Sequence, residues 1–269
     1  MNNILTEKEK RLEEIISSYA SAAVAFSAGV DSTFLAFFAK KVLGEKMAAI
    51  TVNVPSFPAR ELDEAKTFCS DNGIRQLICE VDQLKLSGFY ENPKDRCYHC
   101  KRAIFTAIKK LAHDNGAECV CEGSNLDDMS DYRPGLKALA ELDIKSPLRE
   151  AGLTKADIRA LSKKYGLKTW DKPSFACLAT RIPYGDMITK EKLEMIDLAE
   201  SRLSALGFKQ YRVRVHGDIA RIELPCEDIP RLLDDSLREE INTYFSSLGL
   251  SYTALDLGGF KSGNMNKML

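Results

Sequence analysis

The chain has 269 residues, of which 45% are hydrophobic and 29% are charged, which is the composition of a globular protein. Lys and Arg number 38 against 39 Asp and Glu, so the net charge is -1 and no general attraction to nucleic acid is expected. The first residues are charged and amphipathic, and no run is apolar and long enough to cross a membrane. We therefore expect a cytoplasmic protein.

Short apolar runs alternate with helical patterns through the first two thirds of the chain. Buried strands are expected at residues 22–26, 47–54, 75–81, 118–121 and 144–146. Helices are expected at residues 7–19, 32–43, 59–72, 100–115 and 154–165. This alternation predicts an α/β fold, a parallel sheet sandwiched by helices. Because ligands of such sheets bind at the carboxyl ends of the strands, the loops starting at Ser27, Asn53 and Glu122 are expected to converge.

The pattern changes after about Asp186. A helix is expected at 189–206, and residues 210–225 indicate a hairpin that turns at His216-Gly217-Asp218. Helical segments and a last strand at 251–257 follow. We predict two domains, an α/β domain at 1–186 and a smaller α+β domain at 187–269 that serves substrate binding or oligomerisation.

The segment Ser27-Ala28-Gly29-Val30-Asp31-Ser32 lies between the first strand and the next helix. A glycine lets the backbone approach an anion, and a helix N-terminus presents free N–H groups and a positive dipole end. Asp31 beside a phosphate requires a cation between them, which makes it a candidate Mg²⁺ ligand. The alternative is an ordinary strand–helix turn with a Ser or Asp cap, and spacing alone leaves both open.

SAGVDS resembles the SGGxDS signature of the PP-loop ATP pyrophosphatases, with Ala28 in place of the first glycine. The resemblance implies an adenine nucleotide alpha hydrolase-like fold and a loop that grips the pyrophosphate end of ATP through Ser27, Gly29, Asp31 and Ser32. It also implies that the substrate is adenylated. A GxxxxGK[ST] sequence is absent, which argues against a Walker-type kinase or GTPase.

Longer segments resemble the LarE family, namely CEGSNLDDMSDYRPGLKA, SPLREAGLTKADIRALSKKYGLKTWDKPSFACLATRIPYG, YRVRVHGDIARIE and GGFKSGNMN. Members of that family are pyridinium-3,5-biscarboxylic acid mononucleotide sulfurtransferases, which serve biosynthesis of the nickel-pincer nucleotide cofactor of lactate racemase. The resemblance implies that ATP adenylates a carboxylate of this nucleotide and that sulfur then displaces AMP, a good leaving group. It also implies a homo-oligomer, a ring-like hexamer.

Cys177, in PSFACLATR, stands at the family's sulfur-donating position. Cys97-Tyr98-His99-Cys100 is a CxxC at the start of a helix, where thiolates are favoured. Three-cysteine members of the family hold a [4Fe–4S] cluster, which implies that Cys97, Cys100 and Cys177 are its ligands. The alternatives are a Cys177 that gives up its own sulfur and becomes dehydroalanine, a redox pair, or part of a zinc site with His99. The remaining cysteines are expected to be structural, namely Cys69, Cys79, Cys119, Cys121 and Cys226.

Polar residues follow the fourth strand at the edge where ATP is expected. Asn125, Asp127 and Asp128 are candidates for binding Mg²⁺ or the ribose, although Asp-rich loops are often only turns or helix caps. Arg133 is either a phosphate contact or a surface charge.

Basic residues alternate with apolar ones in the predicted hairpin. The resemblance assigns Arg212 and Arg214 to a phosphate of the substrate or nucleotide, and arginine suits that role because its fork is planar. The alternative is a solvated charged face. Arg181, near Cys177, is a candidate for steadying an adenylate.

Other classes of protein remain possible from the residues alone. A tRNA thiolation enzyme shares the loop, but it should bind a polyanion, and neither the net charge nor any evident RNA module supports this. An amide-forming ligase, such as an NAD or GMP synthetase, needs no cysteine at position 177. A nonenzymatic carrier of a metal or cluster would leave SAGVDS without a purpose.

Overall fold

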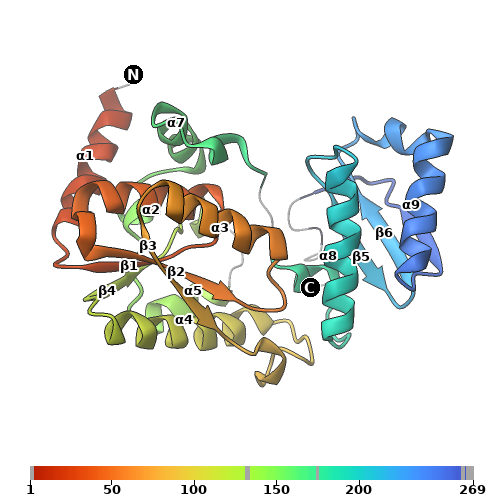
Figure 1. Ribbon diagram of the computed structural model, residues 1–269, viewed down its shortest axis with the longest axis horizontal. Coiled ribbons are helices and arrows are strands. Elements are labelled where there is room, and N and C mark those ends of the chain that lie inside the picture. The colour runs from red at the N-terminus through yellow and green to blue at the C-terminus, as the bar shows by residue number, and fades with distance from the viewer. Residues whose placement is uncertain (1–2, 131–133, 174–175, 262–263, 265–269) are drawn as a thin grey trace. The chain divides into compact units, whose positions relative to one another are not determined.

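The computed structural model describes residues 3–130, 134–173, 176–261 and 264 (Figure 1). The chain divides into two compact units. The first unit consists of Met1–Val54, Ala59–Asp82 and Cys97–Phe175. The second consists of Pro55–Pro58, Gln83–Arg96 and Ala176–Leu269. The sequence pattern changes near Asp186, whereas residues 176–186 already belong to the second unit, because Arg181 pairs there with Glu200.

The first unit is built on a parallel sheet in the order β3-β2-β1-β4. Its strands are β1 (Ala22–Ala25), β2 (Met47–Asn53), β3 (Arg75–Glu80) and β4 (Cys119–Cys121). Its helices are α1 (Asn3–Ser17), α2 (Val30–Leu43), α3 (Ala59–Asp71), α4 (Arg96–Asp114), α5 (Pro134–Glu141), α6 (Pro147–Glu150) and α7 (Lys155–Lys164). The predicted strand at 144–146 is a single bridge, between Cys121 and Lys145.

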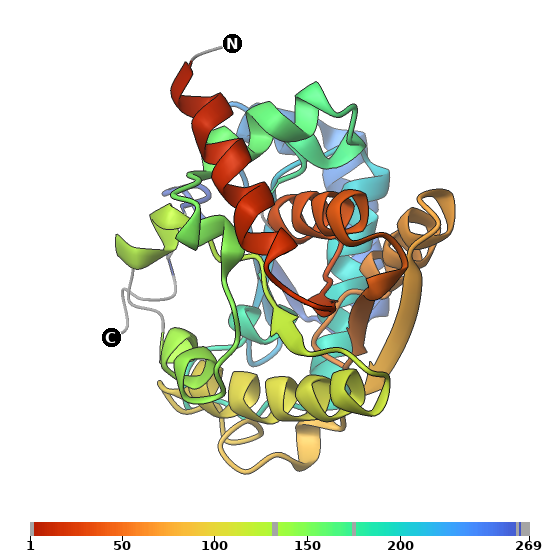
Figure 2. The same ribbon diagram turned by 90° about the vertical axis from the view of Figure 1, so that its left-hand side faces the viewer.

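Helices cover both faces of this sheet. Ala22 and Val24 of β1 lie in one buried cluster together with residues of helices such as α1, α2 and α7. Ala23, which points the other way, lies in a second cluster with Phe105 of α4. Figures 1 and 2 show α2 and α4 on opposite sides of the strands. The predicted α/β sandwich is therefore confirmed, and β1 can be short and alanine-rich because helices bury it from both sides.

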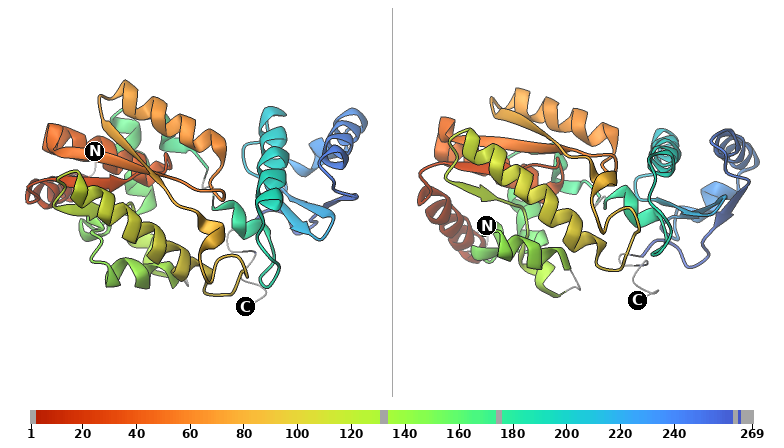
Figure 3. Two further views of the ribbon diagram at one scale, coloured as in Figure 1. Left: turned by 60° about the horizontal axis from the view of Figure 1, so that its bottom comes forward. Right: turned by 90° about the horizontal axis from the view of Figure 1, so that it is seen from below.

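The second unit contains a small mixed sheet in the order β5-β6-β7. Its elements are β5 (Arg212–His216), β6 (Ile219–Glu223), β7 (Tyr252–Leu255), α8 (Lys190–Ala205) and α9 (Asp235–Ser247). β5 and β6 form the predicted antiparallel hairpin, with Gly217 at φ +61° in its turn. β7 is the predicted last strand and runs parallel to β6. In Figure 3, α8 and α9 lie on the same side of this sheet.

Among the residues that the structure describes, no helix combines the length and apolarity needed to cross a bilayer. The eight cysteines all lie within the described residues, and none of them forms a disulfide.

Candidate active site

The SAGVDS loop joins β1 to α2, where the carboxyl end of a central strand meets a helix N-terminus. Gly29 occupies the N-cap position and brings no side chain, so it leaves the first N–H groups of α2 uncapped. The Ser32 hydroxyl lies 3.1 Å from the Ser27 hydroxyl, accepts from the Ser27 N–H at 3.2 Å and donates to the Gly29 carbonyl at 3.3 Å. The loop is braced from within, and the open helix end suits an anion.

Asp31 lies in the first turn of α2, and its two carboxylate oxygens differ in their hydrogen-bond partners. Oδ2 accepts from the Lys155 ammonium at 2.5 Å. Oδ1 is buried and has no hydrogen-bond partner within the described part of the chain. Burial raises the pKa of Asp31, the charge of Asp128 adds to this, and Lys155 opposes it. A buried carboxylate oxygen without a partner, near a second carboxylate, is an arrangement that a divalent cation would satisfy.

The predicted polar loop after β4 forms a set of local hydrogen bonds. Asp128 accepts from the backbone N–H of Asn125 at 3.0 Å, and the side chain of Asn125 accepts from the N–H of Asp127 at 3.0 Å. Asp127 also accepts from the backbone N–H of Lys155 at 2.8 Å, at the start of α7. These contacts fit the turn-and-cap alternative for Asn125 and Asp127, whereas Asp128 also lies near enough to Asp31 to act on its pKa. The predicted role of Arg133 lies outside the described residues.

Gly123 allows this loop to approach α2 closely. A Cβ atom built on Gly123 would lie 3.1 Å from the backbone nitrogen of Ser32 and 3.2 Å from Cβ of Asp31. Any other residue would therefore push the loop after β4 away from the N-terminus of α2. The predicted convergence of the Ser27 and Glu122 loops is confirmed by this contact.

Two lysines beside the loop were missed by the sequence reasoning. Lys155, the first residue of α7, reaches Asp31, and Lys172 places its ammonium 3.1 Å from the carbonyl oxygen of Ala28. A positive charge in the first turn of a helix is disfavoured by the helix dipole, so Lys155 was an anomaly that could have drawn attention. Lys172 carried no comparable signal, because its partners on α3 and in the loop are distant in sequence.

The CxxC thiols lie one turn apart on α4, which begins at Arg96, four residues before the predicted start. Cys97 is exposed and Cys100 is half-buried, as is Cys177 in the second unit. In contrast, Cys69, Cys79 and Cys121 are buried, and burial raises the pKa of the Cys69 thiol to about 12. Among the described residues, no group of three or more His, Cys, Asp or Glu side chains could hold a metal ion. The cluster ligands therefore stay a prediction.

In the second unit, Arg181 holds the turn that carries Cys177. That turn is the short helix η5 (Leu178–Arg181), and Arg181 donates to the carbonyl oxygens of Ala176 at 2.8 Å and Cys177 at 3.2 Å. Its other nitrogens pair with both carboxylate oxygens of Glu200, at 2.8 and 2.9 Å. The Arg181 side chain is 0% exposed, so its position suits holding the Cys177 turn rather than contacting an adenylate.

Arg212 and Arg214 lie on the face of the small sheet that points away from Val213. They are 5% and 8% exposed, so the alternative of a solvated basic face is wrong. Arg214 pairs with both oxygens of Glu223, at 2.6 and 3.0 Å, and donates to the Thr180 carbonyl at 2.7 Å. Burial, together with the charge of Arg181, lowers the pKa of Arg212 to about 10. Their predicted phosphate contacts stay a prediction.

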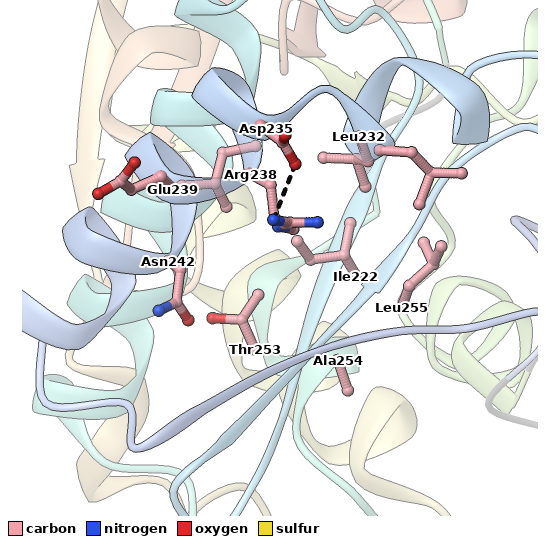
Figure 4. Close-up of a pocket in the computed structure, with 11 residues that line it drawn as sticks. Ile222, Leu232, Asp235, Arg238, Glu239, Asn242, Thr253, Ala254 and Leu255 are labelled. Atoms are coloured by element: carbon pink, nitrogen blue, oxygen red, sulfur yellow. Dashed lines mark ion pairs between the residues drawn. The ribbon is translucent and has the colours of Figure 1, made fainter.

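A cavity of about 730 Å³ opens in the second unit between α9 and β7 (Figure 4). Apolar side chains such as Leu232 and Leu255 line it together with Arg238, which pairs with Asp235 at 2.9 Å. Ile222 of β6 also lines the cavity and points to the opposite face of the sheet from Arg221 and Glu223. The cavity is therefore separate from the arginine–glutamate network.

The fold and the loop together define the class of the protein. A parallel sheet whose first strand leads through SAGVDS into a helix is the arrangement of a PP-loop ATP pyrophosphatase. In this chain an aspartate and two lysines lie around that loop. No protein-family profile matches the chain.

Comparison with known proteins narrows this class. The chain is 36% identical over 266 residues to the pyridinium-3,5-bisthiocarboxylic acid mononucleotide synthase of Lactiplantibacillus plantarum, covering 98% of this chain and 96% of that protein. It is 38% identical over 266 residues to an uncharacterized protein of Synechocystis, covering 99% of each. One subunit of the glutamine-hydrolyzing GMP synthase of Sulfurisphaera tokodaii is 26% identical over 273 residues, covering 91% of this chain and 72% of that protein. The chain belongs to the LarE family, and it is an enzyme of the sulfurtransferase type.

Proposed function

We propose that this enzyme uses ATP to adenylate a carboxylate of pyridinium-3,5-biscarboxylic acid mononucleotide and then replaces AMP with sulfur, forming a thiocarboxylate. The observation that carries the proposal is the similarity to the Lactiplantibacillus plantarum synthase along nearly the whole of both chains. The product would serve the nickel-pincer nucleotide cofactor of lactate racemase. No finding favours a tRNA thiolation enzyme, the alternative from the sequence.

The first unit is proposed to carry out adenylation. The carboxylate oxygen of the substrate attacks the α-phosphorus of ATP, and pyrophosphate leaves. The N-terminus of α2 and the hydroxyls of Ser27 and Ser32 suit the leaving pyrophosphate, because they offer donors where negative charge develops. Lys155 lies beside them and can shift between Asp31 and a phosphate oxygen.

Magnesium is proposed to bind at Asp31, with Asp128 as its neighbour. The buried Oδ1 of Asp31 has no partner in the described chain, which fits a cation ligand. Bound there, Mg²⁺ would offset the charge of the phosphates. Asn125 is proposed to act on the nucleotide from the same edge of the sheet, since it is buried in the loop after β4.

The second unit is proposed to present Cys177 and the substrate phosphate, with Arg212 and Arg214 as phosphate contacts. Both arginines are buried beside carboxylates, so an incoming phosphate has to compete with Glu223 for Arg214. Arg181 and Arg214 both donate to carbonyl oxygens of the Cys177 turn, which ties a cysteine to the arginine network. This arrangement supports a site where the activated carboxylate is brought to sulfur.

A [4Fe–4S] cluster on Cys97, Cys100 and Cys177 is proposed as the sulfur carrier. Cys97, Cys100 and Cys177 are not buried and form no disulfide, so their thiols suit three irons of such a cluster, whose fourth iron could hold an additional sulfide. When bound, the cluster would supply the sulfur atom and spare the cysteines. A cytoplasmic location and a homo-hexamer also belong to this proposal, and eight cysteines without a disulfide are consistent with a reducing compartment.

The activity is tested with anaerobically purified protein, ATP, Mg²⁺ and the dicarboxylate nucleotide. The expected result is release of AMP and pyrophosphate together with replacement of one oxygen by sulfur, detected by mass spectrometry. Asp31→Ala should abolish pyrophosphate release, whereas Cys177→Ala should retain pyrophosphate release and lose both AMP release and the sulfur product. Release of AMP without any requirement for that nucleotide would contradict the proposed substrate.

The sulfur source is tested by iron and acid-labile sulfide analysis. We expect about four irons and four sulfides per chain, lost in Cys97→Ala and retained in Cys226→Ala, an exposed cysteine outside the proposed ligand set. Protein without iron after reconstitution, whose Cys177 becomes dehydroalanine during the reaction, would overturn the cluster and support a sacrificial cysteine.

A further inference from the structure

Ala28, at the centre of the SAGVDS loop, has the backbone conformation of a glycine. Its φ angle is +54°, which lies in the left-handed region, and the residue is buried, with 3% of its surface exposed. Left-handed backbone is disfavoured for an L-residue because Cβ approaches the following carbonyl oxygen. A contact outside the residue therefore has to hold the loop in this shape.

Lys172 provides such a contact from a segment that is distant in sequence. Its ammonium lies 3.1 Å from the carbonyl oxygen of Ala28, 2.8 Å from Glu61 and 2.5 Å from Glu64. The side chain of Lys172 is only 14% exposed, and that of Glu61 only 5%. Burial raises the pKa of Glu61, and Lys172 opposes this effect. The ammonium is therefore anchored to α3 on one side and to the loop on the other.

The hydrogen-bond count indicates how Lys172 acts. A lysine ammonium has three N–H donors, and three acceptors surround this one, from Ala28, Glu61 and Glu64. Its charge is also offset by two carboxylates. Lys172 is thus suited to holding the backbone, and less suited than Lys155 to gripping a phosphate.

Holding one carbonyl group fixes the direction of the next N–H group. A trans peptide is planar, so the Ala28 carbonyl and the Gly29 N–H point in opposite directions. With the carbonyl turned to Lys172, the Gly29 N–H is turned away from it, beside the uncapped N–H groups of α2. We propose that Lys172 is a positioning residue that locks the Ala28–Gly29 peptide so that the Gly29 N–H faces the pyrophosphate of ATP. This inference rests on the proposed use of ATP.

The test is a double-mutant cycle of Lys172→Met and Ala28→Gly, read by titration with α,β-methylene-ATP and Mg²⁺. Without Lys172, an alanine tends to leave the left-handed region, whereas a glycine stays there without strain. The left-handed preference is large enough to weaken nucleotide binding about tenfold in Lys172→Met, and Ala28→Gly should restore most of that loss. In steady-state assays, the KM for ATP should rise while kcat is largely retained, since binding is what is lost.

The controls distinguish a failure of the proposed role of Lys172 from a folding defect and from a failure of the proposed function. Lys110→Met, which breaks an exposed pair with Asp114, should bind as the wild type does. If Lys172→Met does not fold, Glu64→Gln loosens the same ammonium; it should weaken binding about threefold, with recovery by Ala28→Gly. The proposed role of Lys172 would be overturned if the double variant bound nucleotide as weakly as Lys172→Met. It would also be overturned if Lys172→Met bound nucleotide with wild-type affinity. A wild-type protein that binds no nucleotide would overturn the proposed function instead.

Discussion

The buried pair of Arg181 and Glu200 allows a demanding test of how the second unit is held together. The two side chains are 0% and 2% exposed and share two contacts, at 2.8 and 2.9 Å. Glu200 also accepts from the backbone N–H of Val213 at 3.0 Å. The perturbation is the removal of either partner alone, and then of both, as Arg181→Met and Glu200→Leu.

The expected magnitudes follow from these contacts. Removing one partner leaves an uncompensated buried charge, which costs about 3–5 kcal/mol of unfolding free energy. In Glu200→Leu, Arg181 loses the carboxylate with which it pairs, while Glu223 still pairs with Arg214. Removing both partners restores neutrality but takes a hydrogen-bond partner from the Val213 N–H and from the carbonyl oxygens of Ala176 and Cys177, so the double variant should lose about 1–3 kcal/mol.

The assay is urea unfolding of the four proteins followed by circular dichroism. With a urea slope of about 1–3 kcal/mol per M, each single variant should shift its midpoint by about 1 M or more. Arg231→Met serves as control, because it breaks a 3.4 Å pair with Asp228 at a half-exposed arginine and should cost less than about 1 kcal/mol. The folded double variant should still adenylate the substrate and release pyrophosphate, but it should transfer sulfur slowly, since Arg181 no longer holds the Cys177 turn.

The cycle also has a result that would refute this reasoning. If the double variant lost as much stability as the sum of the two single variants, the two charges would not be coupled through burial. A single variant as stable as Arg231→Met would lead to the same conclusion.

Three further predictions concern the loop and its surroundings. Asp31→Asn should stabilise the nucleotide-free protein at pH 7 and abolish binding of Mg²⁺-ATP in a titration. The pKa of Asp31 in the folded protein lies above the unfolded value of 3.8. The stability that its carboxyl group contributes is therefore fully present below pH 3.8 and is lost as the pH rises through the folded pKa. A lower free energy of unfolding for Asp31→Asn than for the wild type at pH 7 would contradict this prediction. Gly123→Ala should lower the free energy of unfolding in urea by about 1–3 kcal/mol and weaken ATP binding, because the new Cβ meets the backbone of Ser32. Unchanged ATP affinity would show that ATP binding does not need this close approach. Thr154→Ala should lower the free energy of unfolding by about 1 kcal/mol, measured by thermal unfolding, because Thr154 caps α7 beside Lys155. A loss of less than a few tenths of a kcal/mol would argue against the capping box.

Local patterns determined the class of fold. Short apolar runs at 22–26 and 47–54, separated by helical periodicity, specify strands buried on both faces, and such strands form parallel sheets under helices. The hairpin at His216-Gly217-Asp218 follows from alternation and a glycine, which are properties of neighbouring residues. SAGVDS could be placed at a strand end for the same reason.

The arrangement around the loop was decided by contacts that no local pattern contains. Lys155 meets Asp31 across 124 residues, and Lys172 meets the Ala28 carbonyl across 144. The same holds for the second unit: the sequence left a phosphate contact or a solvated face open for Arg214, and the structure buries it against Glu223. Alternation along a strand shows which side chains share a face, and only packing decides whether that face meets water, a ligand or protein. The sequence by itself therefore determined the sheet, the loop and the candidate chemistry, whereas the partners of each charged group required the tertiary structure.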